Sequence, residues 1–301
     1  MRSLLIFVLV VVAFSTTQAF GQLSQSDKIT ENLKVTIDES GNAHVVHKVM
    51  GSSLKPVQID MINGTMENFS VTDVNGSTVE YATIQKSPMQ IVLNHSTRNM
   101  TYIKYDLPNA VTNNYGVWNW KYYEPADIDF TDFYFPSGVD MIWANERPVY
   151  LGEHGLRQHG NGFTLEYVIN EPTTTQNVQW ENKNFVVGMK TLLQPSNYVF
   201  EQSQKTYAFD VDKGDIPITV IMPKALLWGP YQIASHQNTT SPVSLYRDNG
   251  THAWIGIIPH RAETVQLTGT TVVPEFPMFV PLAIAVSAVV LFRFVGRLNF
   301  H

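Results

Sequence analysis

Residues 33–49 read LKVTIDESGNAHVVHKV, and this stretch decides the fold class. Apolar and polar residues alternate up to Asp38, polar and Gly residues follow at 39–42, and alternation resumes from Ala43 to Val49. A period of two places the apolar side chains on one face of a strand, and two such runs around a turn rich in Gly and Asn are typical of a β-hairpin. The sequence therefore predicts two antiparallel strands with one buried face.

Similar short runs continue along the chain, separated by turn residues at intervals of about 8–12 residues. Further strands are expected at Val57–Met61, Asn68–Thr72, Thr78–Tyr81, Gln90–Leu93 and Thr101–Tyr105. No amphipathic helical period occurs between the two ends of the chain. The pattern predicts an all-β protein of two or three tandem β-sandwich (Ig-like) domains.

Two polar, turn-rich breaks, at residues 108–114 and 194–197, set the expected domain boundaries. The expected units are a β-sandwich at 22–108, an aromatic-rich β domain at 109–194 and a membrane-proximal β-sandwich at 195–272. The sequence leaves open whether the first two are separate. The aromatic residues between 115 and 143 either stack on sugars or build the core, and core is favoured because each buried ring removes about 150–250 Å² from water.

The first 21 residues have the three parts of a secretory signal peptide. Arg2 provides the positive charge, Leu4–Phe14 the apolar run, and residues 15–21 are mostly small or polar. Cleavage after Ala19 and cleavage after Gly21 fit equally well, and an uncleaved anchor is the alternative. The apolar run is shorter than the ~20 residues that span a bilayer.

The other end of the chain contains a second apolar segment, Phe276–Phe292, which has no charged residue and is followed by Arg293 and Arg297. Its length is at the lower limit for a membrane-spanning helix of roughly 17–25 residues. Basic residues directly after such a helix are typical of a cytoplasmic tail. The sequence predicts a single-pass C-terminal anchor within residues 273–301, with the body of the protein on the extracellular face.

The motif ahead of this segment is Pro274-Glu275-Phe276. Together with the helix and basic tail it resembles the PEF-type C-terminal sorting signals of archaeal surface proteins. The resemblance implies processing by an archaeosortase-like membrane enzyme, which can remove the helix and transfer the protein to another anchor. Pro277 stands where that family usually has Gly, so retention and exchange of the helix both remain open. Residues 198–273, with Met222-Pro223-Lys224, resemble the small β-sandwich that precedes this signal in thaumarchaeal surface proteins.

The charge balance excludes some functions. Without Arg2, Arg293 and Arg297 the exported part has 17 basic and 26 acidic residues, a net charge of −9 with His neutral. Nucleic-acid binding needs clustered Lys and Arg, so we expect no nucleic-acid partner. The chain has no cysteine, which excludes disulfides, thiol catalysis and cysteine-ligated metals.

Seven Asn-x-Ser/Thr sequons indicate a glycoprotein, and they begin at Asn63, Asn68, Asn75, Asn94, Asn99, Asn238 and Asn249. Three of them are Asn-Gly, which is also a favoured hairpin turn, and both interpretations can hold because a hairpin tip is exposed. The sequon-free stretch 109–237 leaves a surface open to a partner.

Metal ligands are sparse. Glu153, His154 and His159 lie in a Gly-rich stretch and could bind copper or zinc, the alternative being an exposed turn. His44 and His47 belong to one strand but should lie on opposite faces. Two acidic runs could hold calcium but lack the EF-hand pattern, namely Asp127, Asp129 and Asp132, and Asp210, Asp212 and Asp215. No other cofactor is expected.

No catalytic motif is present: Gly-x-Ser-x-Gly, Gly-x-x-x-x-Gly-Lys and His-Glu-x-x-His are all absent. Glu166 and Glu171 could serve a glycosidase, but 26 acidic residues offer many such pairs. The sequence favours a non-enzymatic, structural or adhesive protein of the cell envelope, whose partners are the membrane and other envelope proteins or glycans. An extracellular ligand- or metal-binding protein is the alternative, and a secreted hydrolase comes third.

Overall fold

The structure, a computed structural model, describes residues 29–272 except for 52, 54, 95–99, 153–154, 161, 181 and 235–239. Every regular element in this part of the chain is a strand, and none of its residues is helical. The all-β class predicted from the sequence is therefore confirmed. The predicted signal peptide, residues 1–21, and the predicted anchor region, residues 273–301, lie outside the described residues.

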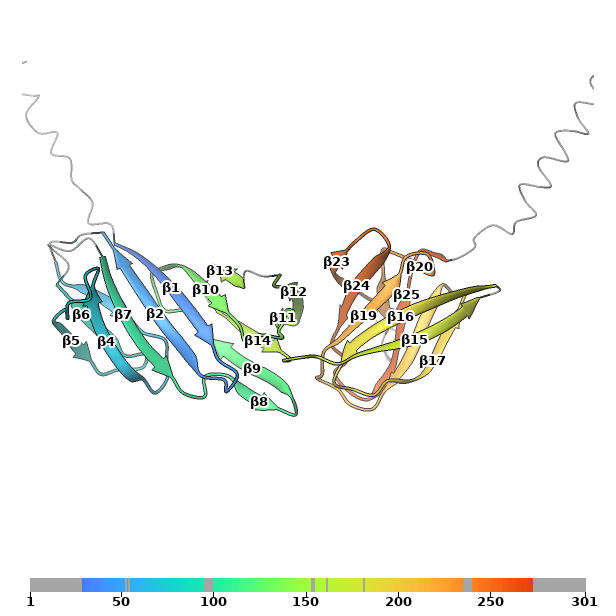
Figure 1. Ribbon diagram of the computed structural model, residues 1–301, viewed down its shortest axis with the longest axis horizontal. Coiled ribbons are helices and arrows are strands. Elements are labelled where there is room, and N and C mark those ends of the chain that lie inside the picture. The colour runs from blue at the N-terminus through green and yellow to red at the C-terminus, as the bar shows by residue number, and fades with distance from the viewer. Residues whose placement is uncertain are drawn as a thin grey trace, which may run out of the picture.

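The strands form two bodies, each with its own hydrophobic core, and Figure 1 shows them side by side. The first body covers residues 29–169 and the second covers residues 173–272. In the first body, sheet A has the order β13 (Leu156–Gln158), β10 (Ile128–Tyr134), β1 (Thr30–Ile37), β2 (Ala43–Met50), β7 (Met100–Leu107) and β4 (Glu67–Asp73). Sheet B has the order β3 (Val57–Asp60), β6 (Gln90–Leu93) and β5 (Tyr81–Ile84). Sheet C has the order β12 (Arg147–Tyr150), β11 (Met141–Ala144), β14 (Phe163–Tyr167), β9 (Val117–Tyr122) and β8 (Thr112–Asn114).

Two five-stranded sheets build the second body. Sheet D has the order β15 (Thr173–Trp180), β16 (Lys183–Thr191), β19 (Ile218–Pro223), β24 (His252–Ile257) and β23 (Ser244–Asp248). Sheet E has the order β17 (Ser196–Glu201), β18 (Thr206–Val211), β25 (Glu263–Thr268), β21 (Gln232–Ala234) and β22 (Thr240–Pro242). A short pair, β20 (Leu227–Trp228) and β26 (Thr271–Val272), completes it. Phe209 of sheet E and Ile255 of sheet D are fully buried in one shared core, which gives this body β-sandwich character.

The hairpin at residues 33–49 forms as the alternation predicts. β1 and β2 pair antiparallel, with Leu33 opposite His47 and Ile37 opposite Ala43. The turn is closed by the amide of Asp38, which donates to the carbonyl of Asn42 at 3.0 Å. Leu33, Val35, Val45 and Val49 are all buried on the inner face.

A parallel pair joins the two halves of the first body. β10 lies alongside β1 in sheet A, with Val35 opposite Phe133 and Lys34 opposite Asp132. The buried Phe133 makes edge-to-face contacts with Tyr122 and Phe163 of sheet C, at ring-centroid distances of 5.0 and 5.4 Å. Ile59, Ile91 and Leu93 of sheet B belong to the same cluster of buried residues, so sheets A, B and C enclose one core.

The domain boundaries predicted at 108/109 and 194/195 do not coincide with the division between the two bodies. The turn at Pro108–Asn109 lies inside the first body, where the amide of Val111 donates to the carbonyl of Gly41 at 2.9 Å. The turn before Ser196 lies inside the second body, and β15 and β16 pair with its sheet D. Turns within a domain and linkers between domains use the same residue types, so composition did not separate them.

The two bodies are in contact around residues 170–172. Asp140 of the first body accepts a hydrogen bond from Lys190 of the second, with 2.8 Å between Oδ2 and Nζ. Gly256 lies so close to the first body that a Cβ there would be 2.6 Å from Pro148 and 2.7 Å from Trp143. A small cavity of about 90 Å³ at this junction is lined by Asp140, Glu171, Lys190 and neighbouring side chains. Burial raises the pKa of Glu171 to about 7, the charge of Asp140 adds to the rise, and Lys190 opposes it.

Phe133→Ala tests whether the first body is one cooperative unit. Phe133 is fully buried, and its loss should lower the free energy of unfolding by about 3–5 kcal/mol. Urea denaturation measures this, and amide exchange should accelerate in β1 as well as in β9 and β14. The control Tyr123→Ala removes a ring that is 58% exposed and should change stability by less than about 0.5 kcal/mol. Faster exchange confined to residues 109–169 would contradict a shared core.

Glu171 predicts a pH dependence of stability. Its pKa is raised in the folded state, so the folded protein binds the proton more tightly than the unfolded chain does. Stability should fall as pH rises from the ordinary value of 4.5 to about 7, by on the order of 1–3 kcal/mol, and then level off. Glu171→Gln should remove this component from urea denaturation curves measured across that range. The exposed control Glu80→Gln should leave it in place, and equal slopes in Glu171→Gln and wild type would refute the assignment.

Candidate functional site

The outer face of sheet A is the surface most clearly built for contact with a partner. Alternation along β1, β2 and β7 buries one set of side chains and leaves the other set partly or fully exposed. Three cross-strand rows make up this face, as follows: Glu67, Asp106, His44, Thr36 and Tyr134; Ser70, Lys104, Val46, Lys34, Asp132 and Arg157; Thr72, Tyr102, Lys48, Asn32 and Phe130. The name "outer face" is used below for these three rows.

The outer face carries a local positive charge on an acidic protein. Its four cations are Lys34, Lys48, Lys104 and Arg157, and its three carboxylates are Glu67, Asp106 and Asp132, which gives a net charge of +1 with His neutral. Among the described residues the three lysines make no salt bridge, whereas Arg157 pairs with Asp132. Lys34 and Lys104 lie two strands apart, about 10 Å in a sheet. The lysine charges are therefore available to an anionic ligand.

Aromatic rings hold two of these cations in place. Two of the three guanidinium nitrogens of Arg157 donate to Asp132, Nε to Oδ1 and Nη2 to Oδ2, each at 2.7 Å. The same guanidinium lies over Phe130, 3.9 Å from the ring centroid. Lys34 Nζ lies 4.7 Å from the ring centroid of Tyr134. Rings interleaved with cations present apolar area and positive charge on one surface.

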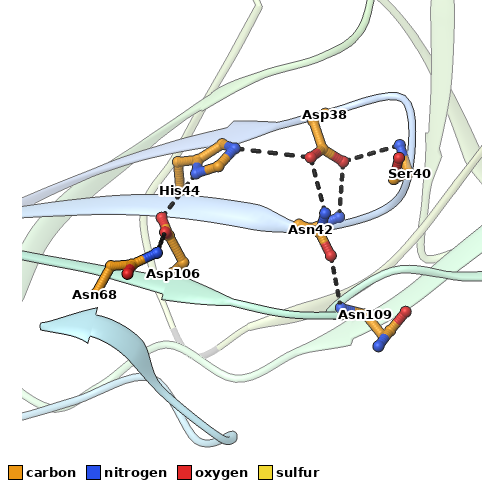
Figure 2. Close-up of polar contacts among 7 residues, drawn as sticks. All are labelled: Asp38, Ser40, Asn42, His44, Asn68, Asp106 and Asn109. Atoms are coloured by element: carbon orange, nitrogen blue, oxygen red, sulfur yellow. Dashed lines mark hydrogen bonds and ion pairs between the residues drawn. The ribbon is translucent and has the colours of Figure 1, made fainter.

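A polar network borders the outer face where β1 turns into β2 (Figure 2). His44 Nδ1 donates to Oδ1 of Asp106 at 2.7 Å, and Nε2 lies 3.7 Å from Oδ2 of Asp38. Asn68 of β4 donates from Nδ2 to the other oxygen of Asp106 at 2.6 Å. The hydrogen bonds from Asn68 and His44 hold the pKa of Asp106 below its ordinary value.

Asp38 organises the turn in Figure 2. Its carboxylate accepts from the backbone amides of Ser40 and Asn42, at 2.8 and 2.9 Å, and from the Asn42 side chain at 2.9 Å. Burial alone would raise the pKa of Asp38, but these hydrogen bonds outweigh it, so the pKa is lowered. Asn42 in turn accepts from the amide of Asn109 at 3.1 Å, which ties the hairpin to the end of β7.

His44 and His47 lie on opposite faces of β2, as predicted. His44 is exposed on the outer face, whereas His47 is fully buried and contacts Glu31, with 2.9 Å between Nε2 and Oε2. The two residues therefore form no joint site.

The described sequon asparagines are all exposed, and they are Asn63, Asn68, Asn75, Asn94 and Asn249. Asn75 lies in the turn between Asp73 and Ser77. The side chain of Asn249 accepts from the backbone of Thr251 and His252, whereas the Asn68 amide is engaged with Asp106. Asn99 and Asn238 lie outside the described residues, as do the sorting-motif residues Pro274, Glu275, Phe276, Arg293 and Arg297. Glycosylation therefore stays a prediction.

Of the three residues considered as copper or zinc ligands, the structure describes His159. Glu153 and His154 lie outside the described residues, and His159 donates from Nδ1 to the carbonyl of Asp129 at 2.7 Å. Within the described part of the chain, no three His, Asp or Glu side chains are grouped so that they could hold a metal ion. That finding covers the two acidic runs considered for calcium: Asp132 pairs with Arg157, and Asp210 accepts from Asn197 and Thr264.

The other candidate residues have structural partners. Glu166 accepts from Asn119 at 2.9 Å, whereas Glu171 lies at the junction of the two bodies. Among the aromatic residues at 115–143, Trp120, Tyr122, Phe133 and Trp143 are buried, in agreement with the expected core role. In the described residues there is no helix long and apolar enough to cross a bilayer, and the predicted anchor at 276–292 is not among them.

Sequence reasoning missed the lysine set of the outer face. Alternation alone could have placed Lys34 and Lys48 on the polar side of their strands. Nothing in the sequence places β10 and β13 beside β1, so the contribution of Phe130, Tyr134 and Arg157 was not foreseeable.

Comparisons with known proteins assign no family to this chain. No protein-family model matches the sequence, and no curated protein matches it. Among solved structures, the chain is similar to an aminopeptidase N family protein from Idiomarina loihiensis, with 8% sequence identity and a TM-score of 0.34. The similarity covers 53% of this chain and 32% of that chain. A similarity this distant carries no inference about this protein.

Asn68→Ala tests the network in Figure 2. Without the Asn68 donor, the pKa of Asp106 should rise toward its ordinary value, as measured by carbon-13 NMR of the carboxyl group. The stabilising effect of the ionised Asp106 is present at neutral pH and is lost as pH falls through its folded-state pKa, so Asn68→Ala should shift that loss to higher pH. The control Asn75→Ala should leave the Asp106 titration unchanged. An unchanged titration in Asn68→Ala would show that this contact is not made in solution.

Proposed function

We propose that this protein is an exported, membrane-anchored cell-surface protein that binds an acidic polysaccharide of the envelope through the outer face of sheet A. Export and anchoring follow from the predicted signal peptide and the predicted helix at 276–292. The exported part comprises two tandem β-sandwich (Ig-like) domains, the second of which adjoins the anchor. The role is adhesive or structural and involves no catalysis.

The observation that carries the proposal is the set of unpaired lysines on the outer face. The exported chain has a net charge of −9, yet Lys34, Lys48 and Lys104 gather on one surface without acidic partners among the described residues. Lysines that lie close together repel one another, and without neighbouring carboxylates this repulsion destabilises the folded protein. Such a group of lysines therefore indicates an anionic partner, which would remove the repulsion.

The neighbouring rings favour a polysaccharide among anionic partners. Tyr102 and Phe130 lie in the same row as Lys48, and Tyr134 lies beside Lys34. Uronic-acid or sulfated sugars combine carboxylate or sulfate groups with apolar ring faces, and these match lysine and aromatic side chains respectively. The extended, open shape of a six-stranded sheet suits a polymer better than a small ligand.

The glycans and the anchor are consistent with this role. Four of the described sequons, Asn63, Asn68, Asn75 and Asn94, lie in the first body, and none falls in 109–237. Glycans at these sites would cover the β4 side of the first body and leave β10 and β13 uncovered. The sequence resemblance to sorted archaeal surface proteins supports the same location.

The double variant Lys34→Glu/Lys104→Glu tests this function. Dextran sulfate and polygalacturonate serve as the probes, and their binding to the immobilised protein is measured by interferometry at several salt concentrations. The double variant should lose about tenfold or more in affinity, which corresponds to ~1.4 kcal/mol, and binding to wild type should weaken as salt rises.

The matched control is Lys183→Glu/Lys213→Glu, which makes the same charge change at exposed positions of the second body. It should bind both polymers within about twofold of wild type, a difference below ~0.5 kcal/mol. Equal losses in the two double variants would indicate binding through overall charge alone, and absence of binding by wild type would refute the proposal.

A further inference from the structure

The last described residues of the second body, 270–272, are hydrogen-bonded to residues 227–229. β26 pairs with β20, so that Val272 lies opposite Leu227. The amide of Thr270 donates to the carbonyl of Trp228 at 2.8 Å, and its hydroxyl donates to the carbonyl of Gly229 at 2.7 Å. The last described residues of the second body therefore lie directly beside Trp228.

An apolar hollow opens at this same end. It has a volume of about 410 Å³, and its apolar lining is formed by Trp228, Pro230, Tyr231, Val243, Leu245 and Ala253. Trp228 is 51% exposed and Leu245 is 49% exposed. A tryptophan side chain that is half exposed leaves on the order of 100 Å² of its surface in contact with water. Burial of that area would contribute about 2–3 kcal/mol of hydrophobic free energy. An occupant that covers these two side chains would recover part of it.

The edge of the hollow is amphipathic. Lys224 Nζ lies 4.3 Å from the ring centroid of Trp228 and 2.8 Å from Oδ2 of Asp248. Tryptophan and lysine beside one another are typical of side chains at a membrane surface, where the ring enters the headgroup region and the ammonium group stays hydrated.

We infer that this end of the second body rests on the bilayer, with Trp228 and Leu245 in the lipid headgroup region. The inference relies on the anchor proposed above. From Val272 to Phe276, where that anchor begins, there are four residue steps, which span at most ~14 Å. The headgroup region is about 5–8 Å deep on each side of the bilayer. The tether is thus short enough to bring the hollow to the membrane, and the lipid surface is the occupant that the chain itself supplies.

Single-cysteine labelling tests the inference, because the chain has no cysteine of its own. The full chain carrying Leu245→Cys is labelled with a nitroxide and reconstituted into phosphatidylcholine vesicles that contain a small fraction of nickel-chelating lipid. The matched control is Asp212→Cys, an exposed position beyond the opposite end of β19. Carbonate extraction of both samples reports separately whether the chain is anchored in the bilayer.

Nickel headgroups should increase the relaxation rate of the label at Leu245 several-fold and leave the label at Asp212 nearly unchanged. Adding Trp228→Ala to Leu245→Cys should reduce that increase, because the ring that holds the hollow at the surface is removed. If the chain resists carbonate extraction but both labels relax alike, the anchor stands and the membrane contact is wrong. If carbonate releases the chain, the proposed anchor is wrong, and the membrane contact inferred from it is wrong as well.

Discussion

The parallel pairing of β1 with β10 is the contact on which the first body depends. It brings together residues about 100 positions apart, and closing such a loop costs on the order of 4 kcal/mol in chain entropy. Burial of Leu33, Val35 and Phe133 along this pair offsets that cost, since each large apolar side chain contributes about 1.5–3 kcal/mol. The same pairing extends sheet A with β10 and β13 and so creates the outer face. Core and candidate site are therefore consequences of one strand pair.

In the absence of disulfides the first body is held together by its buried core, to which a cluster of aromatic rings contributes. Tyr122, Phe133 and Phe163 meet edge to face between sheets A and C, and Trp120 contacts the first two of them at ring-centroid distances of 5.3 and 6.1 Å. Such geometry adds about 0.5–1.5 kcal/mol per pair beyond the area that is buried. Polar turn networks such as that of Asp38 then fix the hairpins, each of which would be marginal alone.

Local patterns in the sequence predicted local structure well. The strand expected at Gln90–Leu93 coincides with β6. The strand expected at Val57–Met61 differs from β3 by one residue at one end, and that expected at Asn68–Thr72 differs from β4 by one residue at each end. The strand expected at Thr78–Tyr81 was displaced: β5 begins at Tyr81, and Thr78 makes only an isolated bridge to Thr72. Alternation reports which face of a strand is buried, but it carries no information about the strand beside it. The pairing of β1 with β10, the division near residue 170 and the lysine set of the outer face all depend on such neighbours, so none could be predicted.

The edges of sheet A determine how a polymer would approach it. Asn68 lies on the edge strand β4, and a glycan there would stand at one border of the outer face. The opposite edge is β13, and no sequon occurs between residues 109 and 237. Arg157 of that strand is held by Asp132 and Phe130, so it is ordered before any ligand arrives and loses little conformational entropy on binding. Lys34 lies further in and has a ring contact with Tyr134 but no acidic partner among the described residues, whereas Lys104 has neither, so Lys104 bears most of the entropic cost of ordering. An acidic chain that enters from β13 would meet the ordered cation first and the unpaired lysines afterwards, which makes β13 the favoured edge for the first contact.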